Sequence, residues 1–211
     1  MLLPAALLLA SCGGPKGPDP LTLEMAGKGT MQNYKPGVEY PLSIRNNGTD
    51  VNVGTLAADG SVNVRITPAQ VQAGQMLSFS GFKKNLDDAK CDSTKLTIQD
   101  TSYRSFTSFF FTTNSGIASV AYAQSEAKNN DGTTTWTRYG FWFAQKAGSL
   151  KGSVVCSGGS SNYDVTLKPG WNIVRSTWTY DPKTETSTPT SFGNVTQGNS
   201  YDGNWYAYRI Q

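Results

Sequence analysis

The fold is indicated most clearly by one stretch, Tyr163-Asp164-Val165-Thr166-Leu167-Lys168-Pro169-Gly170-Trp171-Asn172. Its first part alternates apolar and polar residues, which is the period of a β-strand with one buried face. Pro169 and Gly170 then stand where a type II turn prefers them. The stretch therefore predicts a hairpin: a strand, a tight turn, and a return strand that begins with a buried Trp171.

Strand patterns continue on both sides of this stretch. Val62–Ile66 alternates most regularly, and further strands are predicted at 133–145, 150–157, 171–180 and 204–210. All five Trp follow residue 100, which places the main core or a binding face in the second half of the chain. Met76–Phe79 is also predicted as a strand, and the Thr-, Ser-, Gly- and Pro-rich segment 181–200 as a long mobile or binding loop.

The composition agrees with a β protein. Charged residues make up only 16% of the chain and Gly numbers 22, as in an extracellular domain with many turns. Thr67 before Pro68 predicts a single helical turn at Thr67–Val71. We therefore expect an all-β fold, an antiparallel β-sandwich that is immunoglobulin-like or transthyretin-like in style, with at most one short helical turn.

Two segments resemble known families. The stretch at 163–172 is similar to a hairpin of uncharacterised bacterial envelope lipoproteins, on the residues Tyr163, Val165, Leu167, Lys168, Gly170, Trp171 and Asn172. The segment Gly54 to Val62, with Ala58-Asp59-Gly60 at its turn, resembles the central hairpin of transthyretin-like or carboxypeptidase-regulatory-like modules. These resemblances imply a β-sandwich and an envelope location, but no chemistry.

The N-terminal residues resemble a bacterial lipobox, Leu9-Ala10-Ser11-Cys12, after an apolar run too short to span a bilayer. We expect residues 1–11 to be a lipoprotein signal peptide and Cys12 to be lipidated. The alternatives are an ordinary signal peptide with a coincidental Cys, or an N-terminal apolar strand. By resemblance to lipoproteins of bacteria with two membranes, Gly13 in place of Asp favours the outer membrane or cell surface over the inner membrane.

The rest of the chain is expected to form one unit. Residues 12–20, rich in Gly and Pro, are predicted to be a semi-rigid tether. Residues 21–211 are predicted to form a single large β-sandwich, with a candidate sub-boundary in the polar segment near 82–95.

Assigning Cys12 to lipid leaves an even pair, Cys91 and Cys156. In an oxidising compartment such a pair is expected to form a disulfide, which would be a structural staple. The alternative is two free buried thiols.

The chain contains no histidine, which excludes Ser-His-Asp and Cys-His catalysis and zinc sites with His ligands. The carboxylates that cluster in sequence, Asp87, Asp88, Asp92, Asp181 and Glu185, are read as turn residues and lack calcium-loop spacing. We expect no catalytic residue, no metal and no cofactor. A net charge of +3 with scattered cations gives no indication of nucleic-acid binding.

A candidate binding face comes from strand alternation. Trp136, Arg138 and Trp142 share one face of a predicted strand, and Trp205 and Arg209 share one face of the last strand. Rings beside a guanidinium suit stacking on sugars and also suit anchoring a protein partner. The alternative is that these Trp residues lie in the core, because Trp is highly buried on average.

These patterns predict a non-enzymatic, lipid-anchored envelope protein at the cell surface or in the periplasm. It would contact the membrane through the lipid on Cys12 and act as a structural or protein-interaction module with an envelope protein partner. The alternative is a glycan-binding module that binds polysaccharide through exposed Trp and Arg residues.

Overall fold

A computed structural model describes residues 21–25, 31–32, 37–72, 75–114, 116, 118–194, 201 and 203–209. The predicted signal peptide, Cys12 and the tether therefore lie outside the described residues. Strands dominate the described part of the chain, and the prediction of an all-β fold is confirmed.

The first half of the chain forms β1 (Leu23–Met25), β2 (Met31–Gln32), β3 (Tyr40–Asn46), β4 (Thr49–Leu56), β5 (Val62–Ile66), α1 (Pro68–Gln72), β6 (Leu77–Ser78), α2 (Phe79–Asp88), β7 (Thr97–Gln99) and β8 (Ser102–Phe106). The second half forms β9 (Phe109–Thr112), β10 (Ala118–Lys128), β11 (Thr134–Ala144), β12 (Gly148–Cys156), β13 (Gly159–Leu167), β14 (Gly170–Asp181), β15 (Thr186–Ser187), β16 (Thr190–Asn194) and β17 (Trp205–Arg209).

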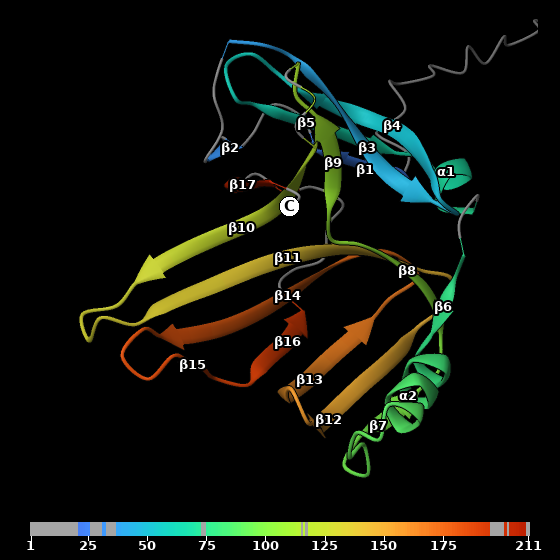
Figure 1. Ribbon diagram of the computed structural model, residues 1–211. Helices are drawn as coiled ribbons and strands as arrows, with labels where there is room; N and C mark the ends of the chain where they lie inside the picture. The colour runs from blue at the N-terminus through green and yellow to red at the C-terminus, as the bar shows by residue number, and fades with distance from the viewer. Residues whose placement is uncertain are drawn as a thin grey trace, which may run out of the picture.

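All of these strands belong to one hydrogen-bonded sheet that bends into two layers (Figure 1). The first layer runs β1-β5-β4-β3-β9-β10-β17-β2, and the second runs β10-β11-β14-β16-β13-β12-β7. β10 belongs to both layers, because its first half pairs with β9 and β17 and its second half pairs with β11. The predicted sandwich is thus formed by two layers of one open sheet. The strands pair antiparallel, except for the parallel pairs β13–β16 and β17–β2.

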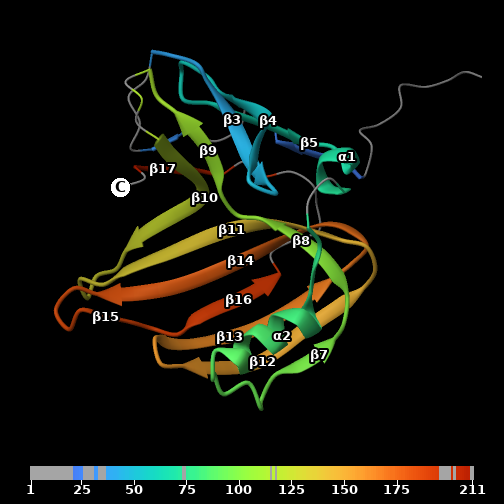
Figure 2. The same cartoon turned by 45° about the vertical axis from the view of Figure 1, so that its right-hand side comes forward.

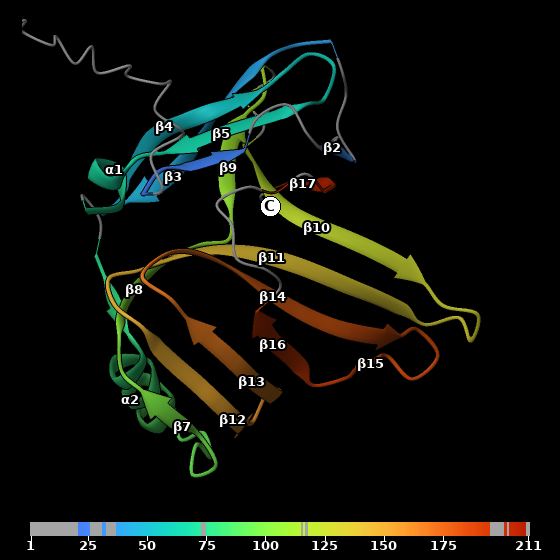
Figure 3. The same ribbon diagram turned by 180° about the vertical axis from the view of Figure 1, so that it is seen from behind.

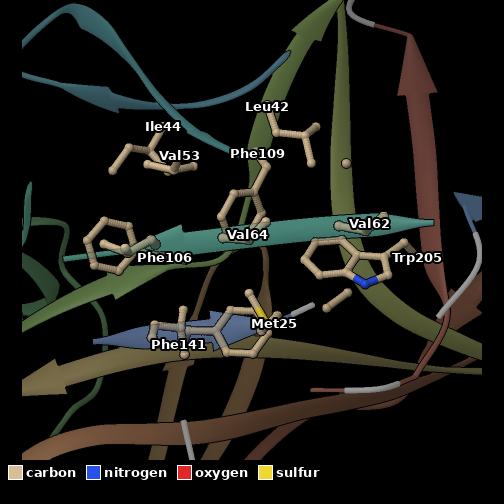
Figure 4. Packing of buried hydrophobic residues seen from close by; sticks show 14 of the residues in the cluster. Met25, Leu42, Ile44, Val53, Val62, Val64, Phe106, Phe109, Phe141 and Trp205 are labelled. Carbon is tan, nitrogen blue, oxygen red and sulfur yellow. The ribbon is translucent and has the colours of Figure 1, made fainter. Parts of the chain in front are cut away.

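The first hydrophobic core lies between the two layers. β3 and β5 contribute Leu42 and Ile66 from one side, and β11 contributes Phe141 from the other. Trp205 is fully buried here, with its ring centroid 5.4 Å from that of Phe109 and 6.3 Å from that of Phe141 (Figure 4). This core holds the layers together, because apolar area removed from water is the main stabilising contribution to folding.

The second hydrophobic core lies on the other face of the second layer, where the sheet curves around α2 (Figure 2). Phe79 of α2 packs there with Leu150, Val165 and Val174 from three strands. The second layer is therefore buried on both faces near its centre: on β14, Ile173 belongs to the first core and its neighbour Val174 to the second.

The expectation of at most one short helical turn is wrong, because α2 adds a ten-residue helix where a strand and a polar loop were predicted. Ser78 caps this helix by accepting a hydrogen bond from the amide of Gly81 (3.0 Å). Phe79, Phe82 and Leu86 follow the helical period and face the second core. The surrounding charges masked this pattern: Lys83 pairs with Asp87 across one helical turn.

The predicted disulfide is confirmed. Cys91 and Cys156 are bonded, with their Cα atoms 4.4 Å apart and a sequence separation of 65. The bond joins the loop after α2 to the end of β12, at the rim of the second core. It therefore holds α2 against the sheet.

The strand–turn–strand prediction at 163–172 is correct in its elements and wrong in its pairing. Gly170 has the positive φ (+89°) that its turn requires, and Trp171 is buried. However, β13 and β14 do not pair with each other, because β16 lies between them and pairs with both. The Asn172 side chain stabilises the turn with two hydrogen bonds. Its amide oxygen accepts from the backbone N–H of Lys168 (2.9 Å), and its amide nitrogen donates to the backbone carbonyl of Lys168 (2.8 Å).

The expectation of a long loop at 181–200 is wrong for its described part, which contains β15 and β16. Phe192 of β16 stacks on Tyr163 of β13, with ring centroids 4.8 Å apart. The Thr-, Ser- and Gly-rich strand β16 is therefore held by its pairing with β13 and β14 and by the contact between Phe192 and Tyr163.

Tyr103 makes the second core sensitive to alkali. Burial, with a smaller contribution from nearby Tyr163, raises the pKa of Tyr103 to about 12. An unfolded phenol titrates near pH ~10, so the stabilisation is complete below that pH and is lost as the pH rises toward ~12. We expect Tyr103→Phe to flatten the fall in unfolding free energy across this window, by up to about 2 kcal/mol, as measured by urea titration. An unchanged pH profile in the variant would show that another group is responsible.

Candidate functional site

The structure divides the five residues of the predicted binding face. Trp205 is fully buried in the first core, and Trp142 lies against the second core, where it stacks on Tyr103 at 4.8 Å. For Trp205 the alternative of a core position is therefore correct, whereas Trp142 is half-buried, as Trp136 is. Trp136 and Arg138 are half-buried on the outer half of β11, and Arg209 is exposed on β17.

Arg209 does not lie beside Trp136 and Arg138. In the register of β10 and β17, Tyr206 is opposite Tyr122 and Arg209 is opposite Ser119. Because side chains alternate along a strand, Arg209 shares a face with the buried Trp205, and Tyr206 shares the face of Tyr122. The structure thus keeps Trp136 and Arg138 together and separates Arg209 from them.

Trp136 and Arg138 are joined by rings from two neighbouring strands. We name the resulting set the aromatic–arginine face: Tyr122 of β10, Trp136 and Arg138 of β11, and Trp178 and Tyr180 of β14. The pairing register brings them together, because Trp136 is directly opposite Trp178 and cross-strand neighbours share one face. All five side chains are half-buried.

The Trp and Tyr rings form a packed row. The ring centroid of Trp136 lies 5.9 Å from that of Trp178, with the planes tilted by 40°. The same Trp136 ring stacks on Tyr180 at 6.1 Å, with the planes 27° apart. Such ring pairs stabilise one another beyond their buried area, so the row is held in place before any ligand arrives.

Arg138 is fixed by the residues around it. Its Cζ lies 3.8 Å from the centroid of the Tyr122 ring, and it donates from Nε (3.1 Å) and Nη2 (2.9 Å) to Oε1 of Gln124. Gln124 is itself buried and donates to the hydroxyl of Tyr208 (2.6 Å). The guanidinium therefore has a defined orientation, which lowers the entropy lost when it binds a ligand.

Within the described part of the chain, no carboxylate forms an ion pair with Arg138. Glu126, on the same side of β10, stands opposite Trp136 in the register. Burial, with a smaller contribution from the charge of Glu126, raises the pKa of Tyr206. The face thus presents a fixed cation among aromatic rings.

Trp136, Arg138, Trp178 and Tyr180 lie on the outer halves of β11 and β14, which reach beyond both the first layer and α2 (Figure 3), and Tyr122 lies near the middle of β10. The aromatic–arginine face is on the same side of the second layer as the second core, because Trp142 and Val174 share this face of β11 and β14. The inner half of this side is covered by α2, and the outer half remains partly exposed.

The opposite side of the same strands differs in chemistry. It carries Thr135, Thr137, Thr177 and Thr179, and Thr135 and Thr179 share a hydrogen bond between their hydroxyls (2.8 Å). A hollow of ≈ 750 Å³ on this side is bordered by charged and hydroxyl side chains, including Arg175. This side offers a matched control surface for the aromatic–arginine face.

Four of the five clustered carboxylates have local partners, and Glu185 lies in a turn, where its φ is 55°. Asp87 accepts hydrogen bonds from Lys83, which lower its pKa, and Thr94 lowers the pKa of Asp92 in the same way. Asp88 pairs with Lys84, and Asp181 accepts from the amide of Lys183. The pKa values of Asp87 and Asp92 thus move in the direction opposite to that of a general acid, whose pKa is raised. In the described ranges, no three His, Cys, Asp or Glu side chains form a group that could hold a metal ion.

Sequence reasoning missed Tyr122, Trp178 and Tyr180. Alternation within 171–180 does place Trp178 and Tyr180 on one face. Only the strand order shows that this face adjoins Trp136, because β14 is separated from β11 by two other strands in sequence.

No family model, curated protein or solved structure matches this chain. The resemblance to envelope lipoproteins and to transthyretin-like hairpins therefore stays a prediction from the sequence. Neither of the two described helices is long and apolar enough to cross a membrane.

Proposed function

We propose that this chain is a non-enzymatic binding module of the bacterial cell envelope, anchored by lipid on Cys12, that contacts another envelope component through the aromatic–arginine face. The observation that carries the proposal is the fixed cation of Arg138 among half-exposed rings of three strands. Tyr, Trp and Arg dominate the binding energy of recognition surfaces, and rigid elements position such residues best.

A binding role is favoured over catalysis by the residue types present. The chain has no histidine, and its clustered carboxylates Asp87, Asp88 and Asp181 are engaged in ion pairs or a turn. The rings and Arg138 supply affinity and orientation but no acid–base pair. The two partner classes that such a face accommodates are an envelope protein and a polysaccharide.

The anchor is supported by the lipobox-like Leu9-Ala10-Ser11-Cys12 and by the disulfide, which is typical of exported proteins. Two or more acyl chains hold a protein stably on a membrane. We expect intact-mass measurement of the chain from a bacterial host to show acylation at Cys12. Recovery of an unmodified Cys12 thiol from the membrane fraction would refute the anchor.

The binding role is tested by Trp136→Ala in the full chain. We expect this variant to bind purified envelope fragments at least about tenfold more weakly in cosedimentation, because removal of a binding-site Trp commonly costs more than 1.4 kcal/mol. Thr137→Ala is the matched control, one residue along β11 on the opposite side, and is expected to bind as the wild type does. Equal binding by both variants would contradict the proposal.

A further inference from the structure

The side chains that surround the rings are polar. On this side of the sheet, the neighbours of Trp136, Arg138, Trp178 and Tyr180 outside the face are Gln124, Glu126, Lys128, Thr134 and Ser176, and Tyr122 adjoins Tyr206 and Tyr208 of β17. Neither these neighbours nor the five face residues include Leu, Ile, Val or Met. The centre of a protein–protein interface is enriched in aromatic residues, Met and Arg and depleted of Lys, Glu and Ser. The rings and Arg138 therefore suit either ligand class, and the polar neighbours Glu126, Lys128 and Ser176 favour a sugar over a protein.

Flat rings with a polar periphery match the chemistry of a sugar. A pyranose has an apolar C–H face that stacks on an aromatic ring, and hydroxyl groups around its edge that need hydrogen-bond partners. Trp136, Trp178 and Tyr180 supply the rings, and Thr134 and Ser176 supply hydroxyls from the same strands. A site of this kind combines ring contacts with a few well-placed polar groups.

Arg138 adds a charge preference. Its guanidinium is oriented by Tyr122 and Gln124 and has no carboxylate partner among the described residues. A guanidinium matches the planar geometry of a carboxylate and binds it by charge-assisted hydrogen bonds. A ligand that brings its own carboxylate to this position would supply the missing counter-charge.

We infer that the aromatic–arginine face binds a polysaccharide whose sugar rings carry carboxylates, with Trp136 and Trp178 stacking on the sugar and Arg138 pairing with the acidic group. The inference rests on the proposed function and names the ligand class of the same face.

The test uses the full chain in mild detergent and uronate polymers as probes: alginate, polygalacturonate and hyaluronan, each beside its carboxyl-reduced form. Reduction converts the carboxylates to alcohols and keeps the backbone of the polymer. We expect binding of at least one acidic polymer, weakened about tenfold or more by carboxyl reduction. Arg138→Gln is expected to cause a similar loss and Arg138→Lys a smaller one, because Lys keeps the charge and loses the planar fork. Arg175→Gln, on the opposite side of β14, is the control and should bind normally.

Two results would overturn the inference. Equal binding of the acidic and reduced polymers by the wild type would refute the charge preference, independently of any variant. If the wild type binds none of the acidic polymers, the ligand class is refuted. If Trp136→Ala still weakens binding to envelope fragments in that second case, the face binds an envelope protein and the proposed function stands. If Trp136→Ala has no effect either, the proposed function fails as well.

Discussion

Replacing both Cys91 and Cys156 with Ser is expected to lower the free energy of unfolding by about 4 kcal/mol. The disulfide closes a loop of 65 residues, so its loss gives the unfolded chain much additional freedom. The loss also releases the loop after α2 from the end of β12, beside the second core. The measurement is equilibrium urea denaturation of both proteins at the same pH.

The control for this prediction is reduction. Dithiothreitol should destabilise the wild type by a similar amount and leave the double Ser variant unchanged. A difference of less than about 1 kcal/mol between oxidised wild type and variant would mean that the bond adds little to what the core already supplies.

Trp205→Ala is expected to cost about 3 to 5 kcal/mol of stability, the range for removal of a large core ring. Trp205 is fully buried, and its ring contacts Phe109, Phe141 and Tyr201. The cavity left behind would lie between the two layers, where those large neighbours cannot close it without moving a strand.

Trp136→Ala is the comparison for Trp205→Ala, because the same side chain is removed from a half-exposed position. We expect it to cost about 1 kcal/mol in thermal or urea unfolding. The two variants thus separate a structural Trp from a binding Trp: Trp205→Ala changes stability more, and Trp136→Ala changes binding more. A larger loss of stability in Trp136→Ala than in Trp205→Ala would contradict the assignment of Trp205 to the core.

Local patterns predicted local elements well. The alternation of Val62–Ile66 predicts a strand, and β5 has these same bounds. Its neighbours β1 and β4 both pair with it in a continuous register, so the alternation of buried and more exposed side chains is kept. The helix α2 was missed because its apolar residues are few and its charged residues pair with each other along the helix. A periodicity search at 3.6 residues over 79–88 could have detected it.

Long-range pairing was not predictable from local patterns. The chain turns at Gly170 as expected, but β16 is inserted between β13 and β14 from a segment that looked like a loop. Its place depends on partners on both sides, and sequence alone does not indicate them. The same reason explains the candidate site. Alternation places Trp136 and Trp142 on one face, but only the folded chain shows that Trp142 packs beside Phe79 of α2 while Trp136 packs with Trp178 and Tyr180.

The most direct test of the central claim is hydroxyl-radical footprinting of the full chain with and without envelope fragments, read by mass spectrometry at single residues. The account predicts that binding protects Trp136, Trp178 and Tyr180 from oxidation, while the buried Trp205 is unreactive in both samples. Protection confined to the opposite side, around Arg175 and its polar hollow, with Trp136 and Trp178 equally reactive in both samples, would contradict it.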